Sequence, residues 1–97
     1  MREASNNVAH HRYELVVDNW TAYVTYERKG NRIVLLHTLV PAALEGKGVG
    51  TALARSTLEQ IRRQGLLVAP ECPFIAGFIK RHPEFQDIVG PPESNPL

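Results

Sequence analysis

Three glycines alternate near the middle of the chain, at Gly46, Gly48 and Gly50, between a strand-like run and a helical pattern. Glycine permits positive φ angles and lets the backbone approach a ligand closely. At the start of a helix several backbone amides point the same way, and the helix dipole adds about half a positive charge. Such a turn is typical of phosphate or pyrophosphate binding, and Lys47 can add a point charge.

The common phosphate-binding motifs do not match this turn. A P-loop requires Gly-Lys-Ser/Thr, but Lys47 is followed by Gly48. A dinucleotide-binding fingerprint requires a third glycine, and the chain has Thr51 or Leu53 at that place, according to the glycine from which the motif is counted. From the glycines alone, a turn that merely reverses the chain is an equal alternative.

The residues before the glycines predict three strands, at 13–17, 20–28 and 32–40. They are rich in strand-forming residues, and residues 20–28 alternate between apolar and polar side chains. The short turn signals Asp18-Asn19 and Lys29-Gly30-Asn31 separate them. The three strands are therefore expected to form an antiparallel meander.

The residues after the glycines predict a change to helical periodicity. Residues 48–64 carry apolar side chains on one broad helical face, and Gly65 suits the end of that helix. Residues 66–69 form a short apolar run, and a strand–helix–strand passage predicts a parallel pairing. The predicted fold class is therefore α/β (α+β).

A second helix is predicted from Cys72-Pro73, because proline is favoured at the first helical position and Cys72 would then be the N-cap. Pro83 ends this helix. The short apolar piece at 85–89 is expected to pack back on the core.

Length and composition limit the remaining possibilities. The 97 residues give one domain, predicted at 12–89, with a disordered tail at 1–11 and an extended tail at 90–97. Eleven basic against ten acidic residues argue against nucleic acid as a partner. No signal peptide and no apolar run of about 20 residues are visible, so a cytoplasmic protein without membrane contact is expected.

The cysteine and histidine residues argue against a disulfide within the chain and against a metal site. The single cysteine excludes a disulfide within the chain. The pair His10-His11 has no partner cluster, so no metal site is predicted. Exposed edge strands make a monomer or a weak dimer the expected state.

Two side chains are suited to catalysis. His37 falls on the predicted face of Ile33, Leu35 and Leu39, where it is either a core histidine or a base that takes a proton from an attacking amine. Cys72 is either a small buried residue or a reactive thiol. The thiol reading rests on two points: a helix N-terminus favours the thiolate, and α/β sites form beyond the carboxyl ends of parallel strands.

The string Gly46-Lys47-Gly48-Val49-Gly50 resembles the coenzyme A pyrophosphate loop of the GNAT superfamily of acyl-CoA-dependent N-acetyltransferases. Gly48 and Gly50 match the two fixed positions of Arg/Gln-x-x-Gly-x-Gly/Ala, whereas Glu45 replaces the initial Arg/Gln. Over residues 13–89 the chain resembles the minimal GNAT-like N-acetyltransferases, in which Glu45 is ordinary. The matching segments are Leu36-His37-Thr38, Val40-Pro41, Leu44-Glu45-Gly46-Lys47-Gly48-Val49-Gly50, Gly65-Leu66, Val68, Pro70, Cys72-Pro73-Phe74 and His82-Pro83-Glu84-Phe85.

The resemblance implies a trimmed GNAT fold, with acetyl-CoA or coenzyme A in a V-shaped split between strands 32–40 and 66–69. It implies His37 and Cys72 as the catalytic pair. It also marks a departure at Phe78, since the family commonly has a tyrosine there that protonates the departing thiolate. The implied cofactor-binding residues are Leu39, Val40, Gly46, Lys47, Gly48, Val49, Gly50, Thr51 and Phe78.

The predicted function is an acetyl-CoA-dependent N-acetyltransferase that acts on an amine, either of a small molecule or of a protein lysine. Cys72 would position the thioester or briefly accept the acyl group. The alternative is a module that binds coenzyme A or acyl-CoA with little or no catalysis, which the phenylalanine at 78 favours. A third possibility is a small interaction domain that keeps the fold without the ligand.

Overall fold

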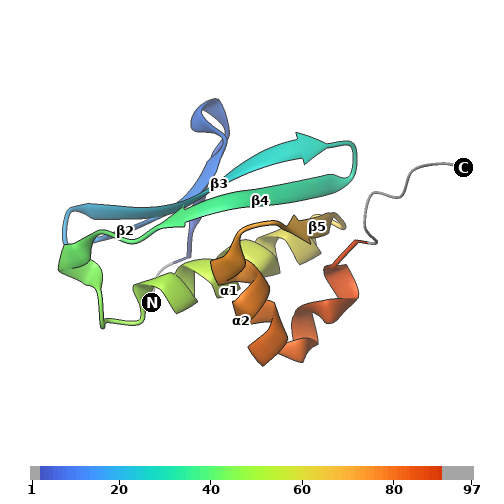
Figure 1. The fold of residues 1–97 in the computed structure, drawn as a ribbon. Helices are drawn as coiled ribbons and strands as arrows, with labels where there is room; N and C mark the ends of the chain where they lie inside the picture. Colours follow the sequence, from blue (N-terminus) through green and yellow to red (C-terminus); the bar gives the residue numbers. More distant parts are fainter. Residues whose placement is uncertain (1–2, 91–97) are drawn as a thin grey trace, which may run out of the picture.

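Five strands form one sheet in the order in which they occur along the chain (Figure 1). The computed structural model describes residues 3–90. The strands are β1 (Ser5–Asn7), β2 (Arg12–Val17), β3 (Trp20–Lys29), β4 (Arg32–Leu39) and β5 (Leu67–Pro70). The helices are α1 (Val49–Arg63) and α2 (Pro73–Arg81), with 3-10 segments η1 (Val8–His10), η2 (Ala42–Leu44) and η3 (Pro83–Ile88). No helix within residues 3–90 is long and apolar enough to cross a membrane.

The sheet is antiparallel from β1 to β4 and parallel between β4 and β5. The predicted meander and the predicted parallel strand are therefore both confirmed. The β2–β3 hairpin turns through Asp18 and Asn19, both with positive φ, and Gly30 with φ +63° forms the next turn. Two-residue hairpins prefer such left-handed residues because their twist matches that of the strands.

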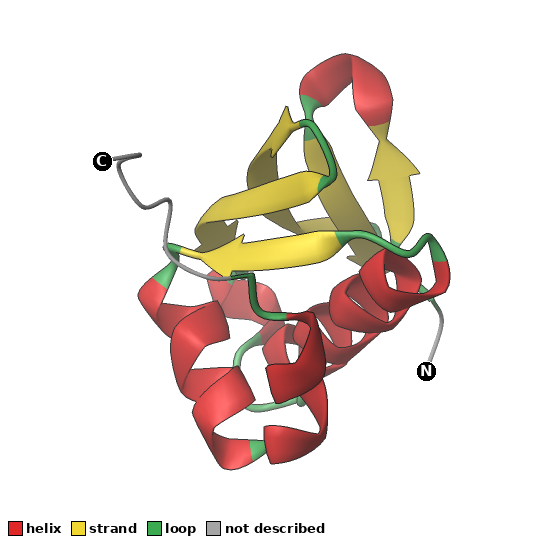
Figure 2. Cartoon of the chain, turned by 90° about the vertical axis from the view of Figure 1, so that its right-hand side faces the viewer, coloured by secondary structure: helices red, strands yellow, loops and turns green. Residues whose placement is uncertain are grey.

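The core lies between the sheet and the two helices, which cover the same face (Figure 2). Alternation along β2 and β3 turns every second side chain toward the helices, as predicted for residues 20–28. The buried residues of the strands are Tyr13, Leu15, Ala22, Val24, Tyr26, Ile33, Val34, Leu35 and Val68. The helices and η3 contribute Val49, Leu53, Ala54, Leu58, Ile61, Ile75, Phe78, Ile79, Phe85 and Ile88.

The N-terminal segment differs from its prediction. The prediction of a disordered tail at 1–11 is wrong for residues 3–11, because β1 pairs with β2 at the edge of the sheet. Hydrogen bonds from α1 hold this segment: the buried Ala4 amide donates to Ser56 Oγ at 2.8 Å, and Gln60 Nε2 donates to the Ala4 carbonyl at 2.6 Å. The partners are more than 50 residues apart, so no local pattern announces them.

The tail predicted at 90–97 lies almost entirely outside the residues that the structure describes. Of the extended tail predicted at 90–97, Gly90 is described, and its amide donates to the Val68 carbonyl at 2.9 Å. The other residues lie outside the described part. The apolar piece before it is confirmed to pack on the core through Phe85 and Ile88 of η3.

Replacing Ser56 with alanine removes the acceptor of the buried Ala4 amide. We expect Ser56→Ala to lower the free energy of unfolding by about 1 kcal/mol, since a buried donor loses its partner while the helix gains a better helix former. Urea denaturation measures this change. Glu59→Ala, an exposed position on the same helix, is the control and should stay within about 0.5 kcal/mol. Equal effects of the two variants would contradict the assigned role of Ser56.

Candidate active site

The glycine turn connects η2 to α1 through two left-handed residues. Gly46 has φ +80° and Gly48 has φ +74°, and a Cβ atom at either would meet no atom within 4 Å. The constraint on both is therefore the backbone angle and not the available space. Leu44 before the turn and Val49 after it are buried, so both ends of the turn are fixed in the core.

The first turn of α1 presents backbone amides without helical partners. Gly48 is the N-cap and carries no side chain that could cap the helix. The first hydrogen bond of the helix runs from the Ala52 amide to the Gly48 carbonyl, at 3.0 Å. The amides of Val49, Gly50 and Thr51 therefore have no acceptor within the helix, and they lie at the positive end of its dipole.

Gly50 has a different reason for being glycine. A Cβ atom there would lie 2.9 Å from Cζ of Phe74 and 3.4 Å from Cγ2 of Val40. The first turn of α1 thus approaches the first turn of α2 and the residue after β4 more closely than any side chain would allow. Three elements meet at this one position, which fixes where the free amides lie.

Strands β4 and β5 part beside this turn. Their ladder has four pairs, from Arg32↔Leu67 to Leu35↔Pro70, and β4 then continues to Leu39 with only β3 beside it (Figure 1). The chain leaves β5 and enters α2 at Cys72, whose amide donates to the Leu35 carbonyl at 2.9 Å. One edge of β4 is therefore unpaired over residues 36–39, within the described part of the chain.

A β-bulge in β4 changes which side chains face the core. Tyr26 pairs with Leu35 and Thr25 with His37, so Leu36 is an extra residue in the strand. Beyond the bulge the alternation is inverted. The prediction that His37 lies on the face of Ile33 and Leu35 is consequently wrong: His37 is exposed on the outer face.

The residue that takes the inner position is Thr38. It pairs with the buried Val24, and its Oγ1 lies 3.1 Å from Sγ of Cys72. Cys72 is the N-cap of α2, as predicted, and is only 3% exposed. The structure therefore places the thiol of Cys72 beside a threonine hydroxyl, at the point where β4 and β5 part.

Comparison with known proteins assigns the chain to a family. A family model described as GCN5-related N-acetyl-transferase matches residues 12–88. The chain belongs to this family. The solution structure of a GCN5-like protein from Staphylococcus aureus superposes with a TM-score of 0.70 at 26% identity, covering 96% of this chain and 92% of that one. The predicted family and fold class are thus confirmed.

Curated relatives of this family member include protein NATD1 of cattle and of human. The Bos taurus protein is 38% identical and the Homo sapiens protein 36% identical, each over 63 residues. The match covers 64% of this chain and 56% of either relative. The chain therefore spans little more than half the length of the curated relatives that it matches.

The predicted catalytic pair of this family member is not brought together. His37 and Cys72 lie on opposite faces of β4, and His37 contacts Thr25 through its backbone, with the amide donating to Thr25 Oγ1 at 3.2 Å. Thr38 is the residue that sequence reasoning missed. Regular alternation through residues 33–39 predicts His37 and Leu39, and not Thr38, on the inner face, and no local signal marks the bulge.

Phe78, which was predicted to contact the cofactor, lies in the core. Its side chain is fully buried and stacks on the His82 ring, with the two ring centroids 4.1 Å apart. The centroid of the Phe85 ring lies 5.9 Å from that of Phe78. In this arrangement Phe78 supports α2 by packing and offers no surface to a cofactor. Leu39, by contrast, is exposed on the outer face, and Val40 packs partly against the core.

Gly50→Ala tests the close contact between the two helices. We expect it to lower the free energy of unfolding by about 1 kcal/mol, because the new methyl group forces Phe74 or Val40 to move. Gly77→Ala is the matched control: it lies within α2, where its Cβ would meet only the flexible end of Arg81 at 3.4 Å. That variant should gain up to about 1 kcal/mol from helix propensity.

Chemical denaturation of both variants measures whether the free energy of unfolding falls for Gly50→Ala and rises for Gly77→Ala, as expected. Gly50→Ala combined with Phe74→Leu should recover part of the loss, since the shorter side chain removes the nearest atom. A Gly50→Ala protein as stable as Gly77→Ala would contradict the assigned contact.

Proposed function

We propose that the chain is an acetyl-CoA-dependent N-acetyltransferase that transfers an acetyl group to an amine. Membership of the GCN5-related family supports acetyltransferase chemistry in general. The observation that carries the proposal is the set of unpartnered amides at Val49, Gly50 and Thr51, next to the unpaired edge of β4. One feature suits a pyrophosphate and the other suits an extended arm that contains amides.

The glycine turn fits a pyrophosphate. The three helical amides can donate to its oxygens, and open space above Gly46 and Gly48 leaves room for close approach. Lys47 pairs with Asp18 at 3.6 Å between Nζ and Oδ2, with both side chains exposed. Exposed pairs of this kind contribute little to stability, so Lys47 can turn to a bound anion.

The unpaired edge of β4 fits the pantetheine arm of coenzyme A. An extended chain with amide groups can add to an open sheet edge through main-chain hydrogen bonds. Leu39 and Val40 would contribute their backbone groups there, since the Leu39 side chain points to the outer face. The arm would then lead from the glycine turn toward Cys72.

When bound, acetyl-CoA supplies an acyl thioester as the acetyl donor. The chain itself must accept a proton from the amine and deliver one to the departing sulfur. Phe78 has no proton to give. We assign proton delivery to the Cys72 thiol, hydrogen-bonded to Thr38, because it lies where the strands part. Since Cys72 is 3% exposed, its burial favours hydrogen bonding over direct attack by sulfur.

The reaction also needs a base for the amine proton, and His37 is the residue predicted for it. His37 is exposed on the outer face of the sheet and could reach only an amine that approaches from that side. This separation also favours the second candidate function, a module that binds coenzyme A with little or no transfer. Both candidate functions require binding of coenzyme A at the glycine turn, and only the first requires transfer of an acetyl group.

Gly48→Asp tests cofactor binding before any acceptor is known. Coenzyme A near 100 times its Kd should stabilise the wild-type protein by about 2.7 kcal/mol and raise its melting temperature. Gly48→Asp should abolish this rise, because a carboxylate would stand among the amides that bind the pyrophosphate. Gly65→Asp is the matched control at the other end of α1, with a similar φ of +72° and equal open space.

Differential scanning fluorimetry of the three proteins, with and without coenzyme A, gives the result. The Gly65→Asp protein should keep the full rise in melting temperature. Loss of the rise in both variants, or its absence from the wild-type protein, would overturn the proposed cofactor site.

Cys72→Ala tests the proposed proton donor. We expect turnover on a panel of amines to fall by about 100-fold while the coenzyme A melting shift stays, because acid–base groups typically contribute this much. His37→Ala should keep most of the turnover. Steady-state kinetics with detection of free thiol measures both variants.

Other outcomes of this assay are equally informative. Full turnover by Cys72→Ala would exclude the proposed donor. An acetyl adduct seen by intact mass on the wild-type protein, but not on Cys72→Ala, would replace proton delivery by a covalent route. No transfer to any amine by a wild-type protein that binds coenzyme A would favour the binding module.

A further inference from the structure

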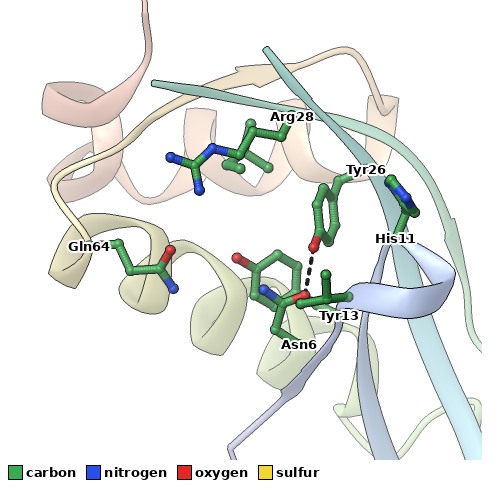
Figure 3. Close-up of a pocket in the computed structure, with 8 residues that line it drawn as sticks. Asn6, His11, Tyr13, Tyr26, Arg28 and Gln64 are labelled. Atoms are coloured by element: carbon green, nitrogen blue, oxygen red, sulfur yellow. Dashed lines mark hydrogen bonds between the residues drawn. The ribbon is translucent and has the colours of Figure 1, made fainter. Parts of the chain in front are cut away.

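A cavity lies at the opposite end of α1 from the glycine turn. It has a volume of about 170 Å³ and is lined by residues of the N-terminal segment, the start of β2, the end of β3, the start of β4 and the residue after α1 (Figure 3). Helix α1 has 15 residues, which places this cavity about 22 Å along the helix from Gly48. It therefore takes no part in the site described above.

The walls of this distal cavity are mainly apolar and aromatic. Val8 and Ile33 line it together with the rings of Tyr13 and Tyr26, whose centroids are 5.1 Å apart. A cavity of about 150 Å³ is large enough for benzene. The volume and the walls thus suit one flat ring or a short aliphatic chain.

The residues that line the distal cavity carry a positive charge. Arg28 is the one residue among the lining residues with a permanent charge, and no carboxylate lines the cavity. Its Nε donates to the Gly30 carbonyl at 2.9 Å, which orients the guanidinium and leaves its terminal nitrogens available. The side chain is exposed, so it marks the rim, and Figure 3 shows it beside the same space as Gln64 and Tyr13.

Tyr13 supplies a buried hydroxyl without a hydrogen-bond partner among the described residues. The other phenol of the cavity is satisfied, since Tyr26 donates to Asn6 Oδ1 at 2.7 Å. Burial raises the pKa of Tyr13, the neighbouring Tyr26 adds to the rise, and the Arg28 charge and the side chain of Gln64 oppose it. The hydroxyl therefore stays protonated at neutral pH and lacks an acceptor, which is costly for a buried donor.

We propose that the distal cavity binds a small monocarboxylate with a flat apolar body, of the size of benzoate. The ring would lie against Tyr13, Tyr26, Val8 and Ile33, and the carboxylate would meet Arg28 and Gln64 at the rim. A charge-assisted pair at a guanidinium gives the site its preference for an anion over a neutral or cationic ligand of equal shape. The N-terminal segment completes the cavity by supplying Val8.

An NMR titration of the isotope-labelled full chain tests this site with benzoate as the probe, at constant ionic strength. We expect saturable shifts of amide signals around the cavity, with a Kd on the order of millimolar for a ligand this small. Benzamide and benzylamine, which have the same ring without the negative charge, should bind at least about fivefold more weakly. Signals of Gly48 to Thr51 should not move, which separates this site from the coenzyme A site.

Arg28→Gln provides the decisive variant. It should weaken benzoate binding about tenfold, whereas Lys29→Gln, which removes the same charge from the next exposed position of β3, should leave it unchanged. No saturable shift with benzoate, equal binding of benzamide, or equal effects of the two variants would each overturn the proposal.

Discussion

The parallel ladder between β4 and β5 is the contact on which the rest of the site depends. It is only four pairs long, and Pro70, which has no amide hydrogen, stands at its last position. The chain must then turn away, and the Cys72 amide takes the Leu35 carbonyl as α2 begins. Strand β4 meanwhile continues toward the glycine turn, paired with β3 on its other edge. The open strand edge and the position of the thiol both follow from this difference in strand length.

Helix α1 connects the two ends of the molecule. Its first turn is held against Phe74 and Val40 by the close approach at Gly50, and this contact fixes the unpartnered amides of the proposed cofactor site. Further along, Ser56 and Gln60 hold the N-terminal segment, which closes the distal cavity. One helix thus positions the proposed cofactor site at its start through backbone groups, and it supports the distal cavity near its end through side chains.

Most of the fold could be predicted because its signals are local. Alternation in residues 20–28, the proline at position 73 and the glycine at position 65 each mark an element or its end within a few residues. The missing pieces depend on distant partners. Strand β1 is held by Ser56 and Gln60, and no apolar pattern marks it in the sequence.

The candidate site was predictable to the same extent. The glycine turn and the cap at Cys72 follow from neighbouring residues, and both are where they were expected. The pair His37 and Cys72 was implied by the family resemblance, whereas the face expected for His37 rested on strict alternation, which the extra residue at position 36 breaks. A bulge depends on the fit between two strands, so a single strand does not reveal it.

The bulge at Leu36 changes which residues of β4 face the core. Before it, odd-numbered residues such as Ile33 and Leu35 serve the core; after it, the even-numbered Thr38 does. A single strand can therefore direct apolar residues of its first half and a threonine of its second half to the same side of the sheet. Strict alternation would instead have placed His37 opposite Val24, in the position beside the Cys72 thiol that Thr38 takes.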